Sequence, residues 1–243
     1  MAETTLTEQT QAEQEERLKC WQVLWGVIRR PGKTFQQTGG RAGLGLPVLL
    51  MLSGTVFLTV ATTLSQQEKI AAQMQKELAG TPGISPEQIE SMVALSASPA
   101  AIVTGAVMAL ICVLLGWVIQ SGILHLVVRA LGGKGVFRQA FGIVCWAWIP
   151  LFLGGVLKGV YVLATGNLPI PQGTGLVNAL LANTDLFAVW NMVILVLGFA
   201  AVYGVSKKRA AVPVVGIWAL TVLFTYATGF FGEALGPGLM EGP

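Results

Sequence analysis

The chain has 243 residues, of which 53% are hydrophobic and only 11% are charged, whereas a soluble domain carries roughly a quarter charged residues. This deficit excludes an ordinary soluble domain and indicates a membrane protein. The net charge of +3 does not indicate a nucleic-acid partner, because the fifteen lysines and arginines stand at the ends of apolar runs and form no patch with interleaved aromatic residues.

The first stretch, 1–16, is acidic and polar. It carries five glutamates, no basic residue and no apolar core, so its composition is not that of a cleaved signal peptide. We expect it to remain on the mature chain as a disordered head. The next stretch, 17–43, is basic and contains tryptophan, and we expect it to form a cytoplasmic segment at the membrane interface.

Within this segment the sequence predicts an amphipathic helix. Two tryptophans on an apolar face favour a helix that lies in the lipid headgroup layer; the alternative is a helix that packs on the rest of the protein. Pro31 then ends the helix and turns the chain toward the membrane. Arg29 and Arg30 are expected to keep this segment on the cytoplasmic side, because basic segments resist translocation across the membrane. The residues on the apolar face are Leu18, Trp21, Leu24, Trp25 and Ile28.

Five later runs are long and apolar enough to cross a bilayer. A hydrocarbon core about 30 Å thick needs roughly 20 apolar helical residues, because lipid offers the backbone no hydrogen-bond partner. We therefore predict an all-α, polytopic bundle over 44–232. The predicted spans are 44–64, 101–128, 140–164, 186–205 and 211–230.

The lysines and arginines between these runs predict the orientation of the chain. Twelve stand on the side of the N-terminus, two stand on the other side, and Lys158 lies within a span. Because cytoplasmic loops carry the excess of basic residues, we expect a cytoplasmic N-terminus, an outside C-terminus with a short tail over 233–243, and location in a bacterial inner membrane.

The connector 65–100 is the one sizeable polar stretch on the outer side. Ile70, Met74 and Leu78 recur every four residues, and Ser85 and Gln88 have the spacing of a helix-capping box. We expect a helical hairpin that caps the outer side of the bundle, with its apolar stripes packed on the spans.

Charge inside a membrane is costly, so Lys158 and Asp185 are the first candidates for a functional site. Both are expected near the outer end of their spans. Three interpretations are open: Lys158 reaches the headgroups while Asp185 caps its helix, the two form a structural ion pair, or they belong to a substrate or proton site.

A second set of polar positions comprises Gln120, His125, Trp190 and Asn191. Gln120 and Asn191 are expected to form hydrogen bonds between helices, and His125 is expected near the cytoplasmic end. A proton relay needs acidic partners along its path, and none occurs between Glu90 and Asp185, so a proton-coupled transporter is not indicated.

Pro150 is expected to kink the third span, because its ring removes an amide donor and crowds the preceding turn. The three cysteines have no metal-ligand spacing and the chain has one histidine, so we expect no metal or disulfide. No phosphate-binding loop, nucleophile elbow or paired catalytic carboxylates occur. We therefore expect no enzyme activity and no cofactor.

The chain resembles the Yip family, the Ypt-interacting-protein type of five-span membrane proteins, in its prokaryotic branch. The matching stretches are IRRPGKTF at 28–35, FRQAFGIVCWAWIP at 137–150 and DLFAVWNMVILVLGFAAVYGVSKKRA at 185–210. The resemblance implies a helical bundle with a cytoplasmic N-terminus, and in eukaryotic relatives it implies binding of prenylated small GTPases. Because the head before the first span is short here, we do not expect a small GTPase as partner.

These observations predict a non-enzymatic membrane protein that organises membrane or partner proteins as a scaffold or accessory subunit. Membrane lipid and a homo-oligomer or another membrane protein are the expected partners. The alternative is a transporter, channel or lipid-handling protein with a cavity between the third and fourth spans, near Lys158, Asp185, Trp190 and Asn191.

Overall fold

The computed structural model describes residues 19–78, 83–96, 98–167 and 175–234. Within these ranges the regular structure is helical and contains no strand, which confirms the predicted all-α class. The predicted head 1–16 and most of the predicted tail 233–243 lie outside the described residues. The helices are α2 (Cys20–Arg29), α3 (Pro31–Thr38), α4 (Gly45–Leu78), α5 (Pro86–Ser96), α6 (Pro99–Ala130), α7 (Phe137–Ala147), α8 (Ile149–Thr165), α9 (Leu176–Asn183), α10 (Leu186–Tyr203) and α11 (Lys207–Ala234).

In the described part of the chain, five helical segments are long and apolar enough to cross a membrane, as the sequence predicts. Four of them lie within single helices. The third joins α7 and α8 through a break at Trp148, two residues before Pro150. The five segments are Gly45–Lys69, Pro99–Ala130, Phe137–Thr165, Leu186–Tyr203 and Lys207–Phe231.

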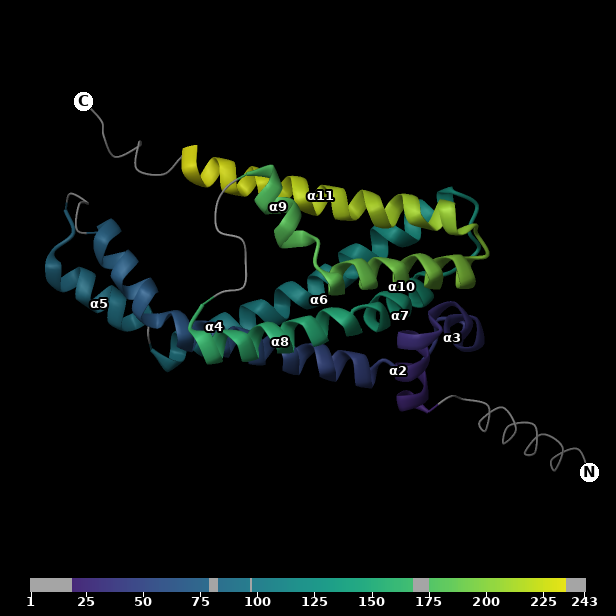
Figure 1. Ribbon diagram of the computed structural model, residues 1–243, viewed down its shortest axis with the longest axis horizontal. Helices are drawn as coiled ribbons and strands as arrows, with labels where there is room; N and C mark the ends of the chain where they lie inside the picture. The colour runs from purple at the N-terminus through teal and green to yellow at the C-terminus, as the bar shows by residue number, and fades with distance from the viewer. Residues whose placement is uncertain (1–18, 79–82, 97, 168–174, 235–243) are drawn as a thin grey trace, which may run out of the picture.

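The third span forms the centre of the bundle and is the most enclosed of the five. Its first half, α7, contacts α6 and α10, and its second half, α8, contacts α4 and α10. Figure 1 shows α4 and α8 on one side of the molecule and α11 on the other. α6 is the least enclosed span, so much of its apolar surface is free to meet lipid or a partner.

Glycines allow the helices of this bundle to approach closely. A Cβ atom at Gly154 would lie 2.7 Å from the Phe187 ring, and one at Gly54 would lie 2.6 Å from the Phe152 ring. A Cβ at Gly159 would likewise meet the ring of Phe57. Since dispersion and close packing drive helix association in lipid, these glycines fix α8 against α4 and α10.

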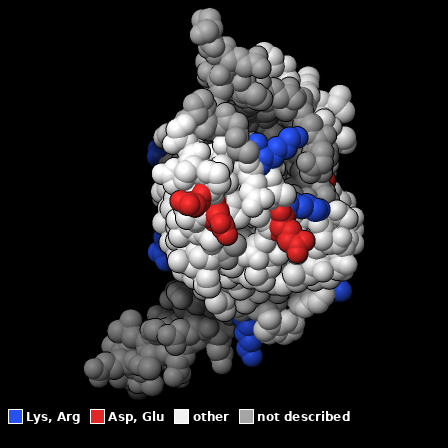
Figure 2. Space-filling model, turned by 90° about the vertical axis from the view of Figure 1, so that its left-hand side faces the viewer, with Lys and Arg blue, Asp and Glu red and all other residues white. Residues whose placement is uncertain are grey.

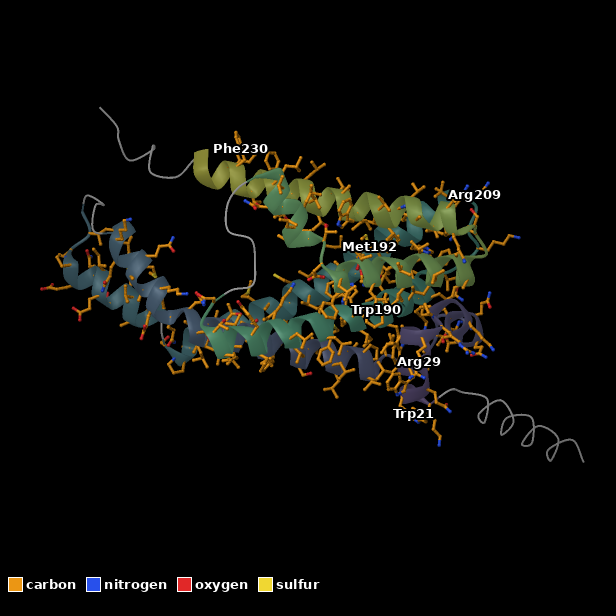
Figure 3. All side chains as sticks on the ribbon, in the orientation of Figure 1. Trp21, Arg29, Trp190, Met192, Arg209 and Phe230 are labelled. Carbon is orange, nitrogen blue, oxygen red and sulfur yellow. The ribbon has the colours of Figure 1, made fainter. Side chains whose placement is uncertain are left out.

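One end of the bundle carries eleven lysines and arginines and, in the described part of the chain, no acidic residue; we call it the basic end. Figure 3 places Arg29 and Arg209 there, with Trp190 near the middle of the bundle. Hydrogen bonds from helices hold its loops: Gln139 on α7 donates to the Gly39 carbonyl, and Arg209 on α11 donates to the Leu131 carbonyl. The basic residues are Lys19, Arg29, Arg30, Lys33, Arg41, Arg129, Lys134, Arg138, Lys207, Lys208 and Arg209.

Helix α2 ends just before Pro31, as predicted, but the predicted turn of the chain into the first span at Pro31 is wrong. Pro31 instead begins a second short helix, α3, because the fixed φ and missing N–H of proline suit the first turn of a helix. α3 packs on α10 through Phe35, which is buried. The turn comes later, at Gly39 and Gly40, whose φ angles of 57° and 69° are positive.

The predicted helical hairpin is present over the end of α4 and α5, but it does not cap the bundle as expected. α5 contacts α4 and the start of α6, has no buried residue, and projects away from the spans (Figure 1). Ser85 and Gln88 form the predicted capping box, since each backbone N–H donates to the other side chain. Figure 2 views this hairpin end, where acidic and basic side chains lie on a mostly uncharged surface.

Candidate functional site

Lys158 on α8 and Asp185 before α10 form an ion pair, with Lys158 Nζ 2.7 Å from Asp185 Oδ2. The other carboxylate oxygen, Oδ1, accepts the backbone N–H of Ala188 at 2.8 Å. One carboxylate therefore both caps α10 and pairs with the lysine, so the predicted helix cap and the predicted structural ion pair occur together. The side chains are 38% and 33% exposed, so the pair is neither buried nor fully open.

The pair lies toward the hairpin end of the bundle. α10 has 18 residues, and at 1.5 Å per residue it is about 27 Å long. Asp185 precedes its first residue, whereas Tyr203 ends it at the basic end. This depth corresponds to the leaflet on the side of the hairpin.

Just before Asp185 the chain forms a short helix, α9, that the sequence analysis did not predict. Asn183, at its end, donates to Thr225 Oγ1 on α11 at 3.1 Å, and its carbonyl accepts from Trp218 Nε1 at 3.2 Å. These bonds tie the break between α9 and α10 to α11. The apolar stretch LVNALLAN at 176–183 was the available signal, but its eight residues are too few for a span.

The bend in the third span is supported by polar side chains from two neighbouring spans. Pro150 has no N–H, and no backbone N–H in the described chain reaches the carbonyl of Ala147 at the break. Asn191 Nδ2 on α10 donates to this carbonyl at 2.8 Å, and Trp148 Nε1 donates to Gln120 Oε1 on α6 at 2.8 Å. Asn191 and Gln120 thus connect helices as predicted, and both do so at the bend.

Three buried polar atoms around the same bend have no hydrogen-bond partner within the described residues: Trp117 Nε1, Ser121 Oγ and Trp146 Nε1. The Trp117 ring contacts the Trp148 ring edge to face, at 5.7 Å between centroids. Buried polar groups in proteins are nearly always paired, so these three atoms are exceptions to the rule. They make the interior of the bend polar as well as aromatic.

His125 belongs to a separate cluster at the basic end. Its Nδ1 lies 2.7 Å from the hydroxyl of Tyr203, which in turn donates to the Val136 carbonyl at 3.2 Å. A Cβ at Gly133 or Gly135 would meet the Tyr203 ring. Tyr203, which the sequence analysis did not select, therefore holds the loop before α7 against the end of α10.

The six candidate positions do not form one site. Lys158 and Asp185 pair toward the hairpin end, Gln120 and Asn191 hold the bend, and His125 lies at the basic end. Trp190 is half-buried and packs against the apolar core.

The two tryptophans predicted to anchor the chain at the interface lie on the exposed face of α2. Trp21 and Trp25 are 59% and 50% exposed, whereas Val23 and Val27, which were not among the predicted anchors, are buried against the protein. The Arg29 guanidinium lies over the Trp25 ring, 4.8 Å from its centroid. Helix α2 therefore packs on the bundle with one face, as in the alternative weighed from the sequence, and leaves its two tryptophans exposed, while their placement in the headgroup layer stays a prediction. Arg30 and Pro31 form the junction with α3.

Comparison with known proteins agrees with this architecture. The Yip1 domain family model matches residues 25–228. Among curated proteins, the chain is similar to membrane protein YknW of Bacillus subtilis (strain 168), with 23% identity over 225 residues that cover 88% of this chain and 92% of the relative. No solved structure matches the chain. The family match, which extends over most of the chain, establishes that this chain is a membrane protein of the Yip1 domain family.

Proposed function

We propose that the protein is a non-enzymatic scaffold or accessory subunit that organises other membrane proteins. The observation that carries this proposal is the use of the polar side chains within the spans. Lys158 bonds to Asp185, Asn191 bonds to a backbone carbonyl, and Gln120 bonds to Trp148. These groups support bends and helix ends, which favours a structural bundle over a path for solutes.

The orientation follows from the charge bias. The basic end faces the cytoplasm and the hairpin faces outward, in keeping with the positive-inside rule, and the membrane is the inner membrane of a bacterium. The partners are membrane lipid and either further copies of this chain or another membrane protein, while nucleic acid and a small GTPase are not among them.

The least enclosed helix, α6, is the surface that such a partner would meet. Leu115, Ile119 and Leu126 are exposed along it, and Cβ atoms at Gly116 and Gly122 would contact nothing within 4 Å. Small residues beside exposed apolar ones permit close helix association in a bilayer.

Oxidative cross-linking at Cys112 tests self-association through α6. Cys112 is exposed on this helix, whereas Cys145 is buried and Cys20 lies at the basic end. A homodimer joined along α6 would give a disulfide-linked dimer in native membranes, which the Cys112→Ser variant would lack. Purification from cross-linked membranes, followed by mass spectrometry, would identify a different partner protein instead.

One observation favours the alternative of a transporter, channel or lipid-handling protein. The Lys158–Asp185 pair keeps about a third of its surface exposed, beside a break between α9 and α10, and discontinuous helices often line transport sites. Flux of lipid and of small solutes in proteoliposomes, measured beside partner co-purification, separates the two functions.

The informative variants are Lys158→Ala and Asp185→Asn, with Lys76→Ala on the exposed hairpin as the matched control. A scaffold predicts no flux above protein-free liposomes in any variant. If wild-type protein supported flux that both site variants abolished while the partner still co-purified, the scaffold would be abandoned for the alternative.

A further inference from the structure

A cleft of about 1040 Å³ opens at the basic end between α2, the loop 39–44 and the start of α7. Arg41 and Arg138 line it from two sides, and Gln37, Thr38 and Cys20 complete the polar part of its wall. The remaining lining includes Val23 and Leu44, which are apolar. The cleft therefore combines two cations with an apolar rim.

The loop that forms one wall of this cleft is fixed in place. Gln139 Nε2 on α7 donates to the Gly39 carbonyl at 2.9 Å, and the Arg41 N–H donates to the Thr38 carbonyl at 2.9 Å. A Cβ at Gly142 would clash with the Gly40 carbonyl oxygen, so the loop lies directly against α7. The wall is thus held in one shape before any ligand arrives.

The cleft has an excess of hydrogen-bond donors. Within the described chain, the backbone N–H groups of Ala42, Gly43 and Leu44 donate to no protein acceptor, and they precede α4, whose first turn is the positive end of a helix dipole. The described residues at this end include no carboxylate that could neutralise Arg41 or Arg138. Free amides and unpaired guanidinium groups together form a binding site for an anion.

The position of the cleft relative to the ends of the spans indicates which kind of anion it would bind. Arg41 stands four residues before the first span, and Arg138 is the second residue of the third span. The exposed Trp21 and Trp25 lie on α2 at the same end, and tryptophan favours the headgroup level of a bilayer. A ligand in the cleft would therefore meet the phosphate layer of the adjacent leaflet.

We propose that this cleft binds the phosphate group of an anionic phospholipid from the leaflet at the basic end. Arg41 and Arg138 contact the phosphate oxygens, the free amides of the loop 42–44 supply further donors, and the acyl chains leave past Leu44 along the apolar rim. The assignment needs only the membrane location of the family and does not depend on the scaffold role.

Cys20 provides a reporter of occupancy, because it is exposed and lines the cleft. The full chain, in a Cys112→Ser background, is reconstituted in nanodiscs of phosphatidylglycerol or of phosphatidylcholine, and the rate of Cys20 alkylation by a neutral maleimide is measured. The proposal predicts alkylation about tenfold slower in phosphatidylglycerol, the factor that mass action gives when the lipid is present at about ten times its Kd.

Charge variants test whether the cleft causes this protection. Arg41→Gln with Arg138→Gln removes two charge-assisted contacts, which weakens binding on the order of a hundredfold, so the lipid dependence should disappear. Lys207→Gln with Lys208→Gln removes the same charge from the start of α11, outside the cleft, and should retain it. Equal protection in all three proteins would overturn the proposal.

A second pair of variants applies if the double arginine variant does not fold. Gly43 does not have a positive φ, and a Cβ there would make only an ordinary contact with Cys20 Sγ at 3.7 Å. Gly43→Asp should abolish the protection by placing a carboxylate in the cleft, whereas the isosteric Gly43→Asn should keep it. Equal behaviour of the two variants would contradict an anion site.

A final arm separates the lipid from a soluble source of phosphate. Inorganic phosphate is added to the phosphatidylcholine nanodiscs. The proposal predicts that Cys20 stays reactive there, because a free ion lacks the acyl chains that hold a lipid at the rim. If inorganic phosphate protected Cys20 as well as phosphatidylglycerol does, the lipid assignment would be overturned in favour of a soluble phosphate ligand.

Discussion

Replacement of Asn191 by leucine tests how the bent third span is stabilised. Asn191 is buried, and its amide donates to the Ala147 carbonyl, which accepts no backbone N–H in the described structure. Leucine has a similar volume and no donor, so the variant leaves a carbonyl unpaired inside the bundle. An unpaired buried acceptor costs about 1–3 kcal/mol in proteins, and hydrogen bonds between membrane helices contribute about 1 kcal/mol. We expect Asn191→Leu to lower the free energy of unfolding by about 1–2 kcal/mol.

The cause of this loss can be isolated by removing the bend. In a Pro150→Ala background the third span can continue as one helix, and the Leu151 N–H can reach the Ala147 carbonyl. The cost of Asn191→Leu should then fall to near zero, because the carbonyl no longer needs the amide. Reversible unfolding in mixed detergent micelles, followed by tryptophan fluorescence, gives the four free energies of this cycle. An equal cost of Asn191→Leu in both backgrounds would refute the reasoning.

Two further predictions concern packing at the basic end. Gly142→Ala should destabilise the protein by about 1–3 kcal/mol, since the added methyl group overpacks a contact with the Gly40 backbone. The control Gly105→Ala should not destabilise it, because a Cβ there contacts nothing within 4 Å. Equal unfolding midpoints of the two variants in detergent would contradict this prediction. Tyr203→Phe should cost about 1 kcal/mol through its lost bond to the Val136 carbonyl and should speed hydrogen exchange in the loop 131–136, so unchanged exchange would count against the role of the hydroxyl.

The features that could be predicted from the sequence are those set by local composition. A long run of apolar residues forms a helical span because lipid offers no hydrogen-bond partners to the backbone N–H and C=O groups. This argument predicted the five spans without knowledge of how they pack. The capping box at Ser85 and Gln88 depends on residues three apart in the chain, and it forms as expected.

The features that were missed depend on contacts between distant segments. α3 forms because Phe35 is buried beside Gly198 of α10, where a Cβ would meet the Phe35 ring. No pattern in the local sequence predicts this packing site. The cleft has the same origin, because its two arginines are 97 positions apart in the sequence and only the packing of the loop 39–44 on α7 brings them to one wall. The hairpin failed to cap the bundle because α4 continues as one helix past its apolar segment, which ends at Lys69, to Leu78.

The central claim is that five helices cross the membrane and leave the basic end in the cytoplasm. A pair of topology reporters tests it most directly, one fused before Met1 and the other after Pro243, in two separate fusion proteins expressed in bacterial cells. An odd number of spans and the positive-inside rule predict cytoplasmic activity for the first reporter and external activity for the second. Activity of both reporters in the same compartment would contradict the five-span account.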